Sequence, residues 1–173
     1  RSADDLFSLE FFPPRKDMPI DSVYEAISQL SGFSPAFVSV TYGAGGSSRS
    51  RTIEIASHVK NALHMEAIAH LTCVDSPVAQ IREIVKKLEA AGIENILALR
   101  GDPPQGEAAF KPHPEGFRYA AELTGFLRGL GGFCLGGACY PEGHVECPDG
   151  QAGLDHLAAK VAAGAEFLVT QLF

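Results

Sequence analysis

Ala90-Ala91-Gly92-Ile93-Glu94-Asn95-Ile96-Leu97 shows how one structural unit of this chain passes into the next. Small residues end a helical pattern, a glycine follows, and an apolar run begins. Ala162-Ala163-Gly164-Ala165-Glu166-Phe167-Leu168 repeats this order of small residues, glycine, acid and apolar run. Glycine supplies the left-handed cap with which a chain leaves a helix and reverses direction. The two copies therefore predict a fold built from repeated helix-to-strand units.

Apolar runs of strand length recur along the whole chain. Their starts lie about 30 to 40 residues apart, which is the size of one strand plus one helix. Apolar strands that alternate with helices indicate a parallel sheet, either an open doubly wound sheet or a (β/α)8 barrel. The six runs are Phe7–Phe12, Ala36–Tyr42, Glu66–Thr72, Asn95–Leu99, Phe133–Ala138 and Glu166–Phe173.

Four segments between these runs have the periodicity of amphipathic helices. Ser22 and Glu25 form a capping-box pattern at the start of the first segment. Ser76-Pro77 begins the second segment, which Gly92 ends. The apolar stripes are Val23, Ile27 and Leu30; Ile81, Ile84, Val85 and Leu88; Ala120, Leu123, Leu127 and Leu130; and Leu154, Leu157, Ala158 and Val161.

The overall composition is that of one globular domain over residues 1–173. The chain is 46% hydrophobic and has a net charge of −7. This acidic balance, without a Lys/Arg cluster, argues against nucleic acid as a partner, although local groups can still bind small anions. No apolar stretch reaches the roughly 18 residues that span a bilayer. Residues 1–7 lack a signal-peptide pattern, so we expect a cytoplasmic protein without a membrane partner.

Cysteine and histidine usage predicts neither a disulfide framework nor a metal site. Cys73, Cys134, Cys139 and Cys147 include no Cys-x-x-Cys pair, and we expect most of them to be buried small apolar residues. The histidines are isolated and have no carboxylate at ligand spacing. His70 taken alone is best interpreted as a core histidine that hydrogen-bonds to backbone.

Polar residues gather where the expected strands end. In either parallel architecture the chemistry lies at the carboxyl ends of the strands, so these residues predict a functional site there. They are Glu10, Thr41–Gly46, His70–Thr72, Arg100–Pro104, Tyr140–His144 and Thr170–Gln171.

Glu10 is the most informative of these residues. It lies in Ser8-Leu9-Glu10-Phe11-Phe12-Pro13-Pro14-Arg15, an apolar run that two prolines end. An apolar environment favours the protonated form of a carboxyl group, which is the form that a general acid needs. The alternative is a glutamate on an edge strand that points to water.

The glycine-rich loop after the second run has two interpretations. Gly43-Ala44-Gly45-Gly46 resembles a phosphate-binding fingerprint, but Ser48 stands where its third glycine belongs, and no clear ribose-binding acid follows. A Rossmann dinucleotide site is therefore weakly supported. The glycines could instead let backbone approach a flat ligand closely, or simply make a turn.

Two further loops also allow alternatives. Arg100-Gly101-Asp102 at a parallel strand end suits recognition of a polar heterocycle or a phosphate. The same residues could form a local ion pair that fixes the turn, and an exposed adhesion tripeptide is disfavoured because no secretion signal precedes it. Tyr140 and His144 could stack on a ligand or merely cover the end of the sheet.

Several motifs together resemble the methylenetetrahydrofolate reductase family, in order from one end of the chain to the other. The resemblance implies a flavin-dependent (β/α)8 barrel that reduces 5,10-methylenetetrahydrofolate to 5-methyltetrahydrofolate with NADH or NADPH, in a ping-pong reaction that feeds methionine biosynthesis. The motifs are Ser8–Arg15, Phe37–Tyr42, His70–Cys73, Ala98–Pro103, Tyr140–His144 and Thr170–Phe173.

The resemblance also implies roles for individual residues. Glu10 matches the general acid that opens the five-membered ring of the folate, after which the hydride comes from reduced FAD. Asp102 matches a carboxylate beside flavin and pterin that stabilises the cationic intermediate, and Gln171 matches an amide that contacts substrate or nicotinamide. The FAD contacts would be Thr41, Tyr42, Ala44, His70, Arg100, Gly101, Asp102, Tyr119, Ala120, Tyr140, His144, His156 and Lys160.

A full (β/α)8 barrel takes about 250 residues, and this chain has about six of its eight βα units. We therefore expect a single catalytic FAD-binding barrel domain that lacks its last two units, as a fragment of a longer protein that forms a homo-oligomer. One alternative is a non-catalytic flavin- or folate-binding remnant of that barrel. Another is an unrelated barrel enzyme that acts on a phosphorylated metabolite.

Overall fold

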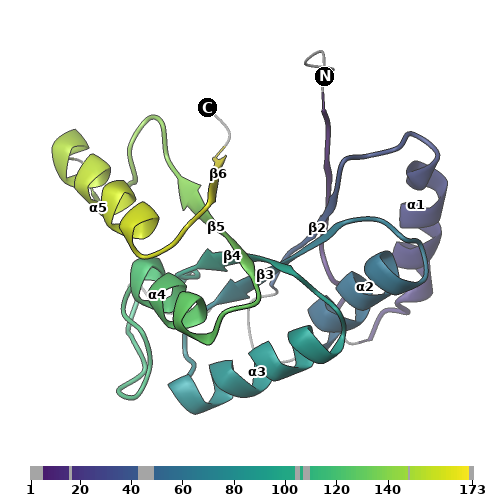
Figure 1. The fold of residues 1–173 in the computed structure, drawn as a ribbon, viewed down its shortest axis with the longest axis horizontal. Coiled ribbons are helices and arrows are strands. Elements are labelled where there is room, and N and C mark those ends of the chain that lie inside the picture. The colour runs from purple at the N-terminus through teal and green to yellow at the C-terminus, as the bar shows by residue number, and fades with distance from the viewer. Residues whose placement is uncertain are drawn as a thin grey trace. The chain divides into compact units, whose positions relative to one another are not determined.

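The computed structural model describes residues 6–15, 17–42, 49–103, 106, 110–147 and 149–171. Strands and helices alternate throughout these ranges (Figure 1). Their order is β1 (Leu9–Phe11), α1 (Asp21–Ser31), β2 (Val38–Val40), α2 (Arg49–Asn61), β3 (Ala67–Thr72), α3 (Val78–Ala90), β4 (Asn95–Leu99), α4 (Ala120–Leu130), β5 (Cys134–Cys139), α5 (Gly150–Ala162) and β6 (Phe167–Thr170).

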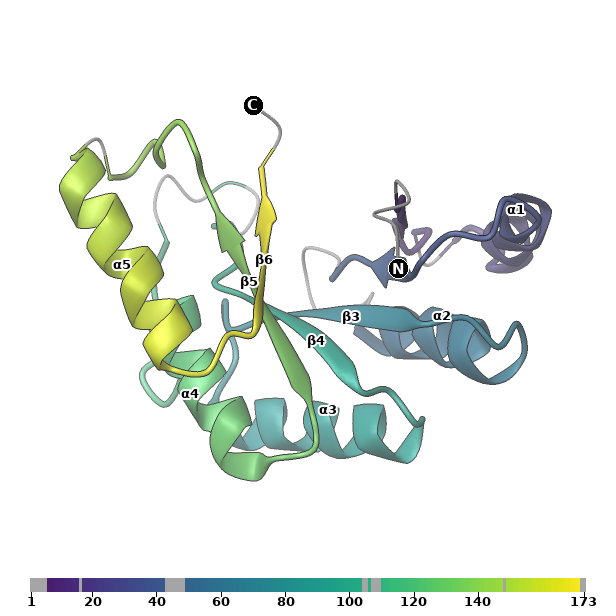
Figure 2. The same cartoon turned by 45° about the horizontal axis from the view of Figure 1, so that its top comes forward.

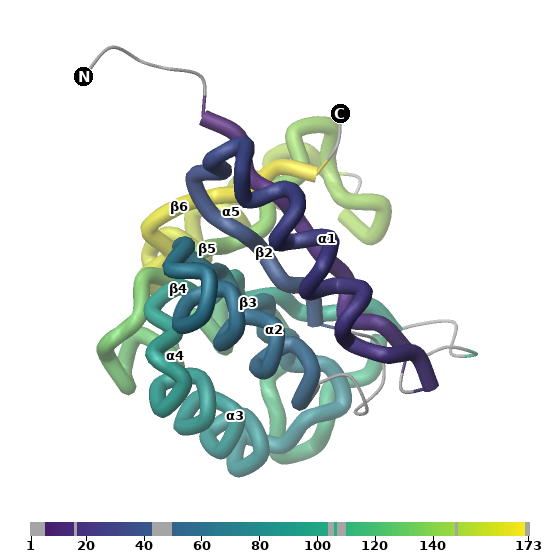
Figure 3. The backbone as a smooth tube through the Cα atoms, turned by 90° about the vertical axis from the view of Figure 1, so that its right-hand side faces the viewer, coloured from purple at the N-terminus to yellow at the C-terminus, as the bar shows by residue number. Residues whose placement is uncertain are grey.

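The strand order decides between the two parallel architectures. The sheet runs β1-β2-β3-β4-β5-β6, and the pairs β1/β2, β2/β3, β4/β5 and β5/β6 are parallel. A doubly wound sheet reverses its strand order at a switch point, whereas the strands of a (β/α)8 barrel follow one another in chain order. The six expected apolar runs are thus confirmed as strands of a partial (β/α)8 fold. Figure 3 traces the alternation from α1 to β6.

The chain forms two compact units. The first comprises Arg1–His70 and Ile84–Glu94, and the second comprises Leu71–Glu83 and Asn95–Phe173.

The first unit carries a parallel sheet with two chemically different faces. Val38 and Val40 of β2 are fully buried on one face, and α2 packs against β2. The register pairs Glu10 with Ser39, and Ser39 with Ile68. Because side chains alternate along a strand, these residues lie in one row on the opposite face from Val38 and Val40.

The second unit packs helices on one side of its strands. Figure 2 shows α4 and α5 on the same side of β5 and β6, and α4 contacts β4, β5 and α5. Leu123 and Leu127 of α4 are fully buried, as their periodicity predicts. The stripe on α5 is different, because none of its residues is buried and Leu154 is 61% exposed.

Three details differ from the sequence predictions. The capping box at Ser22 is wrong, because α1 begins at Asp21 and the Ser22 hydroxyl donates instead to the carbonyl of Pro19, at 3.2 Å. Helix α2 was not predicted, although Thr52, Ile55 and Val59 are buried at helical spacing. The prediction of mostly buried cysteines is also wrong, since Cys73 is buried and the other three are partly exposed. No helix in the described ranges is long and apolar enough to cross a membrane.

Candidate functional site

The residues that the sequence predicts for the site lie on or directly after the strands and on α4 and α5. In the first unit these are Glu10 on β1, Thr41 and Tyr42 directly after β2, and His70 on β3. Ala44 lies outside the described residues. In the second unit they are Arg100, Gly101 and Asp102 after β4, Tyr119 and Ala120 at the start of α4, Tyr140 and His144 after β5, His156 and Lys160 on α5, and Gln171 after β6.

Glu10, Ser39 and His70 form one cluster in the first unit, which we call the serine-centred cluster. The Ser39 Oγ lies 2.6 Å from His70 Nε2 in a buried hydrogen bond. The Glu10 Oε2 lies 3.5 Å from Ser39 Oγ and 3.5 Å from His70 Nε2. Neighbouring parallel strands bring the three side chains together, because each contributes one residue to the same face.

The serine-centred cluster contains no buried cation. Burial lowers the pKa of His70 to about 4, because the charged imidazolium loses its hydration inside the protein. His70 is therefore neutral at pH 7, and its contact with Glu10 is not an ion pair. The Glu10 side chain is 49% exposed and reaches both solvent and these two neutral partners. Of the two alternatives for Glu10, the structure therefore favours the edge-strand glutamate that reaches water, with two polar neighbours, over a carboxyl group in an apolar environment.

Thr41 offers a buried hydroxyl at a predicted flavin contact. Both backbone hydrogen-bonding groups of Thr41 have partners: its N–H donates to the carbonyl of Phe11 at 3.0 Å, and its carbonyl accepts the Thr52 hydroxyl at 2.9 Å. Its Oγ1 has no hydrogen-bond partner among the described residues. An unpaired buried hydroxyl costs free energy unless a ligand or water satisfies it, so Thr41 fits a polar ligand.

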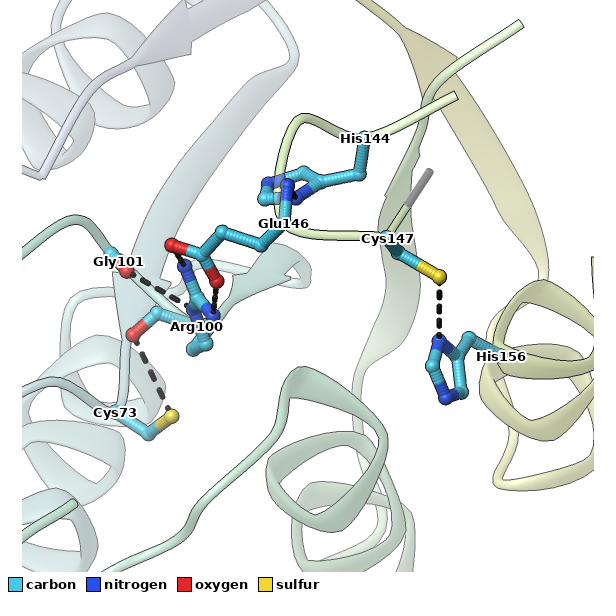
Figure 4. A network of polar contacts seen from close by, with 7 residues as sticks. All are labelled: Cys73, Arg100, Gly101, His144, Glu146, Cys147 and His156. Atoms are coloured by element: carbon cyan, nitrogen blue, oxygen red, sulfur yellow. Dashed lines mark hydrogen bonds and ion pairs between the residues drawn. The ribbon is translucent and has the colours of Figure 1, made fainter. Parts of the chain in front are cut away.

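Arg100 anchors a second group of contacts, which we call the arginine cluster (Arg100, His144 and Glu146; Figure 4). Its guanidinium forms two hydrogen bonds with Glu146, at 2.5 and 3.1 Å. Its Cζ lies 4.7 Å from the centre of the Phe110 ring. The Arg100 hydrogen bond lowers the pKa of Glu146. The ion pair therefore joins two strand-end loops, in place of the alternative of a local ion pair with Asp102 that fixes one turn.

Gly101 holds the loop after β4 in a conformation that requires glycine. Its φ is +87°, and a Cβ built there would lie 2.7 Å from Val74 Cγ1. A side chain would thus be strained by the backbone and would also collide with its neighbour. Asp102 follows directly and is exposed.

His144 has a defined hydrogen-bonding state in the arginine cluster. Its Nδ1 accepts the backbone N–H of Glu146 at 3.0 Å. A neutral imidazole that accepts at Nδ1 carries its proton on Nε2, so Nε2–H is the donor of this ring. The ring packs edge-on against Tyr140, with 4.6 Å between the ring centres. Glu146 thus organises both Arg100 and His144.

The predicted contacts on α4 and α5 include one stacked pair and one lysine. Tyr119 and His156 lie face to face with their ring centres 6.5 Å apart. The Lys160 Nζ donates to the carbonyl of Ala138 at 2.6 Å, and burial lowers its pKa. Ala120 is buried within α4, where its carbonyl accepts the Thr124 hydroxyl.

The family model for methylenetetrahydrofolate reductase matches residues 1–173. The chain belongs to the methylenetetrahydrofolate reductase family.

Relatives of this family come from plants and bacteria. The chain is 39% identical to methylenetetrahydrofolate reductase (NADH) 1 of Arabidopsis thaliana, over 96% of this chain and 30% of the plant protein. It is 43% identical to 5,10-methylenetetrahydrofolate reductase of Pectobacterium carotovorum, over 96% of this chain and 54% of the bacterial protein. The chain thus spans 30% of the length of this plant relative and 54% of the length of this bacterial relative.

A solved structure supports the fold independently. The chain superposes on the deoxyribose phosphate aldolase of Aeropyrum pernix with a TM-score of 0.61, over 95% of this chain and 62% of the aldolase. The sequence identity is 14%, so this likeness concerns the fold alone.

Two residues that contact the predicted site residues have no role predicted from the sequence. Ser39 lies in the Phe37–Tyr42 motif, but only the strand register shows that it lies between Glu10 and His70. Glu146 pairs with Arg100 across 46 positions, which no local pattern reveals. Thr72, which the sequence already places among the polar residues at the strand ends, has a buried hydroxyl without a hydrogen-bond partner in the described ranges.

Proposed function

We propose that the natural protein carrying this chain reduces 5,10-methylenetetrahydrofolate to 5-methyltetrahydrofolate, with FAD as hydride carrier and NADH as electron donor. Residues 1–173 would form the larger part of one catalytic barrel domain. The observation that carries the proposal is Glu10, which lies on β1 beside two uncharged hydrogen-bonding partners in a chain of this family.

The residues present fit a bound flavin. The buried Thr41 hydroxyl offers an unused donor and acceptor, and Gly101 lets backbone run where a side chain could not. His144 presents an Nε2–H donor, and Lys160 presents a cation. When bound, FAD supplies a centre that accepts a hydride from the nicotinamide and passes it to the folate.

Glu10 would hold and deliver the proton of the reaction. Opening the five-membered ring of the folate requires protonation of a ring nitrogen, and a carboxyl group within reach of that nitrogen can supply the proton. The partial exposure of Glu10 leaves room for the substrate. Ser39 and His70 place no formal charge beside it at pH 7, so the carboxyl group is not locked in an ion pair.

Asp102 and Gln171 are the residues of the second unit to which we assign roles toward the substrate. Asp102 is exposed after β4, where a carboxylate stabilises positive charge that develops on the pterin. The Gln171 backbone N–H donates to the carbonyl of Cys139 at 2.9 Å, which fixes the start of the loop after β6. Its amide side chain can then contact folate and nicotinamide in turn.

NADH is the donor that the relatives favour. The matched plant proteins are named as NADH enzymes. One flavin that serves two substrates in succession gives ping-pong kinetics, so parallel lines are expected in double-reciprocal plots of initial rates.

The visible spectrum of the purified natural protein tests this function. Oxidised flavin should copurify or bind on addition of FAD, lose its absorbance with NADH, and regain it with methylenetetrahydrofolate as 5-methyltetrahydrofolate forms. A protein that takes up no FAD, or whose reduced flavin ignores the folate, contradicts the proposal.

A further inference from the structure

The serine-centred cluster contains a contact that the proposed chemistry does not yet use. Ser39 Oγ lies 2.6 Å from His70 Nε2, and this bond is much shorter than the two 3.5 Å contacts to Glu10. Ser39 and His70 are each 8% exposed. The buried Ser39–His70 pair is therefore the fixed part of the cluster, and Glu10 is its adjustable, solvent-facing part.

Only two arrangements of hydrogens satisfy the short bond. In the first, the Ser39 hydroxyl donates to His70 Nε2, and His70 carries its proton on Nδ1. In the second, His70 Nε2–H donates to Ser39 Oγ, and the Ser39 hydroxyl is free to donate to a third atom. A neutral imidazole has one N–H and a serine has one O–H, so the two arrangements exclude each other.

The position of Glu10 decides between these arrangements. Glu10 Oε2 lies at the same distance from Ser39 Oγ and from His70 Nε2. In the first arrangement the Ser39 hydroxyl already donates to His70, so it cannot donate to Glu10 Oε2. In the second arrangement the Ser39 hydroxyl points its hydrogen at Glu10 Oε2, which is electrostatically favourable.

We propose that Ser39 is a positioning residue for Glu10: His70 Nε2–H donates to Ser39 Oγ, and the Ser39 hydroxyl donates to Glu10 Oε2. The role in catalysis rests on the proposed function, whereas the hydrogen-bond chain itself does not. His70 fixes the direction of the Ser39 hydroxyl, and this hydroxyl fixes the carboxylate without adding a charge. The hydrogen bond restricts the conformations of the half-exposed Glu10 side chain, so that the carboxyl group is more often in its reactive position.

The tautomer of His70 is the direct readout of this chain. We expect ¹⁵N NMR of the histidine-labelled natural protein at pH 7 to show His70 as the Nε2–H tautomer, with the signal assigned by its loss in His70→Asn. A dominant Nδ1–H tautomer overturns the proposal. This measurement needs neither turnover nor folate, so it separates failure of the hydrogen-bond chain from failure of the proposed function.

Rapid-mixing kinetics of Ser39→Ala test the positioning role. The variant should bind FAD and be reduced by NADH as the parent is, while reoxidation by methylenetetrahydrofolate slows about tenfold, a part of the effect of a general acid. Ser39→Thr restores the hydroxyl and should recover most of that rate. Ser57→Ala is the matched control, because it removes a hydroxyl of the same unit that accepts from Asn61, at 3.1 Å.

Two kinetic outcomes would overturn the positioning role. An unchanged folate half-reaction in Ser39→Ala means that the hydroxyl does not hold Glu10. Equal loss of both half-reactions, or no recovery in Ser39→Thr, means that Ser39 only packs.

Discussion

The serine-centred cluster and the arginine cluster differ in the charge and in the burial of their side chains. In the first, a short bond between two uncharged, buried side chains lies beside one half-exposed carboxylate. In the second, a charged pair with side chains 21% and 47% exposed joins two loops. Neutral partners suit a group that must gain and lose a proton, whereas a two-pronged ion pair suits a loop that must keep its shape around a polar ligand.

The difference makes each cluster sensitive to a different perturbation. Protonating a buried histidine costs the most free energy, because the new charge is not hydrated. His70 should therefore make the serine-centred cluster sensitive to pH. Exposed ion pairs are screened by salt, so the arginine cluster should respond to ionic strength. The predictions below use these sensitivities.

Gly101→Val should give the largest loss, because it distorts the loop that carries the arginine cluster. A positive φ and a clash with Val74 together cost about 4 kcal/mol of unfolding free energy. We expect reduced FAD binding and a lower midpoint in urea denaturation.

Gly129→Ala is the matched control, since a Cβ at this glycine meets no atom within 4 Å. It should leave FAD binding intact and keep or slightly raise stability. Equal effects of the two substitutions would show that the positive φ and the close packing at Gly101 do not determine stability or FAD binding.

Lowering the pH should selectively destabilise the serine-centred cluster. The unfolded chain protonates His70 near pH 6.5, but the folded chain resists protonation until about pH 4. Stability from this group is therefore complete above pH 6.5 and is lost as the pH falls toward 4, by about 3 kcal/mol in total. Urea denaturation at several pH values measures this slope.

Two histidine variants isolate the contribution of His70. His70→Gln should flatten the stability profile between pH 6.5 and 4 relative to the parent protein. His64→Asn changes an exposed histidine of the same unit, whose φ of 54° asparagine tolerates. It should keep the parental slope, and a parental slope in His70→Gln would contradict the burial argument.

Glu146→Gln should weaken the arginine cluster moderately. It removes the charge that holds Arg100 but keeps the backbone N–H that His144 accepts. We expect FAD binding to weaken about threefold at low salt, and the difference from the parent protein to shrink as salt screens the ion pair. Glu142→Gln, on the same loop, should bind FAD normally.

Thiol reactivity should show the smallest effect and separate buried from exposed positions. Burial raises the pKa of Cys73 to about 11 and leaves its side chain inaccessible. Cys147 is partly exposed near His156, with 3.9 Å between Sγ and Nδ1. Iodoacetamide at pH 8 should label Cys147 and spare Cys73, as peptide mass analysis can establish. Prompt labelling of Cys73 would indicate that the second unit is less compact than described.

Most of the fold was predictable because it follows from local patterns. Apolar runs, helical stripes and glycine returns predicted all six strands and four of the five helices. Helix α2 has a weaker apolar pattern, because the polar Thr52 is buried at helical spacing together with Ile55 and Val59. The Ser22 capping box failed because the backbone enters the helix earlier than the side-chain pattern suggests.

The candidate site was predictable residue by residue but not as a network. Glu10 and His70 stand out in the sequence, whereas the role of Ser39 depends on strand register. The Arg100–Glu146 pair depends on how two distant loops fold back. Contacts between strands and loops are set by tertiary structure, so sequence periodicity cannot reveal them.

The half-reactions of Glu10→Gln test the central claim most directly. With Glu25→Gln as control, NADH should reduce the flavin of both variants at the parental rate. Reoxidation by methylenetetrahydrofolate should slow by about 10²- to 10⁴-fold in Glu10→Gln alone, because only that step needs the proton. Parental reoxidation in Glu10→Gln, or equal loss of both half-reactions, would contradict the assignment of Glu10 as the acid.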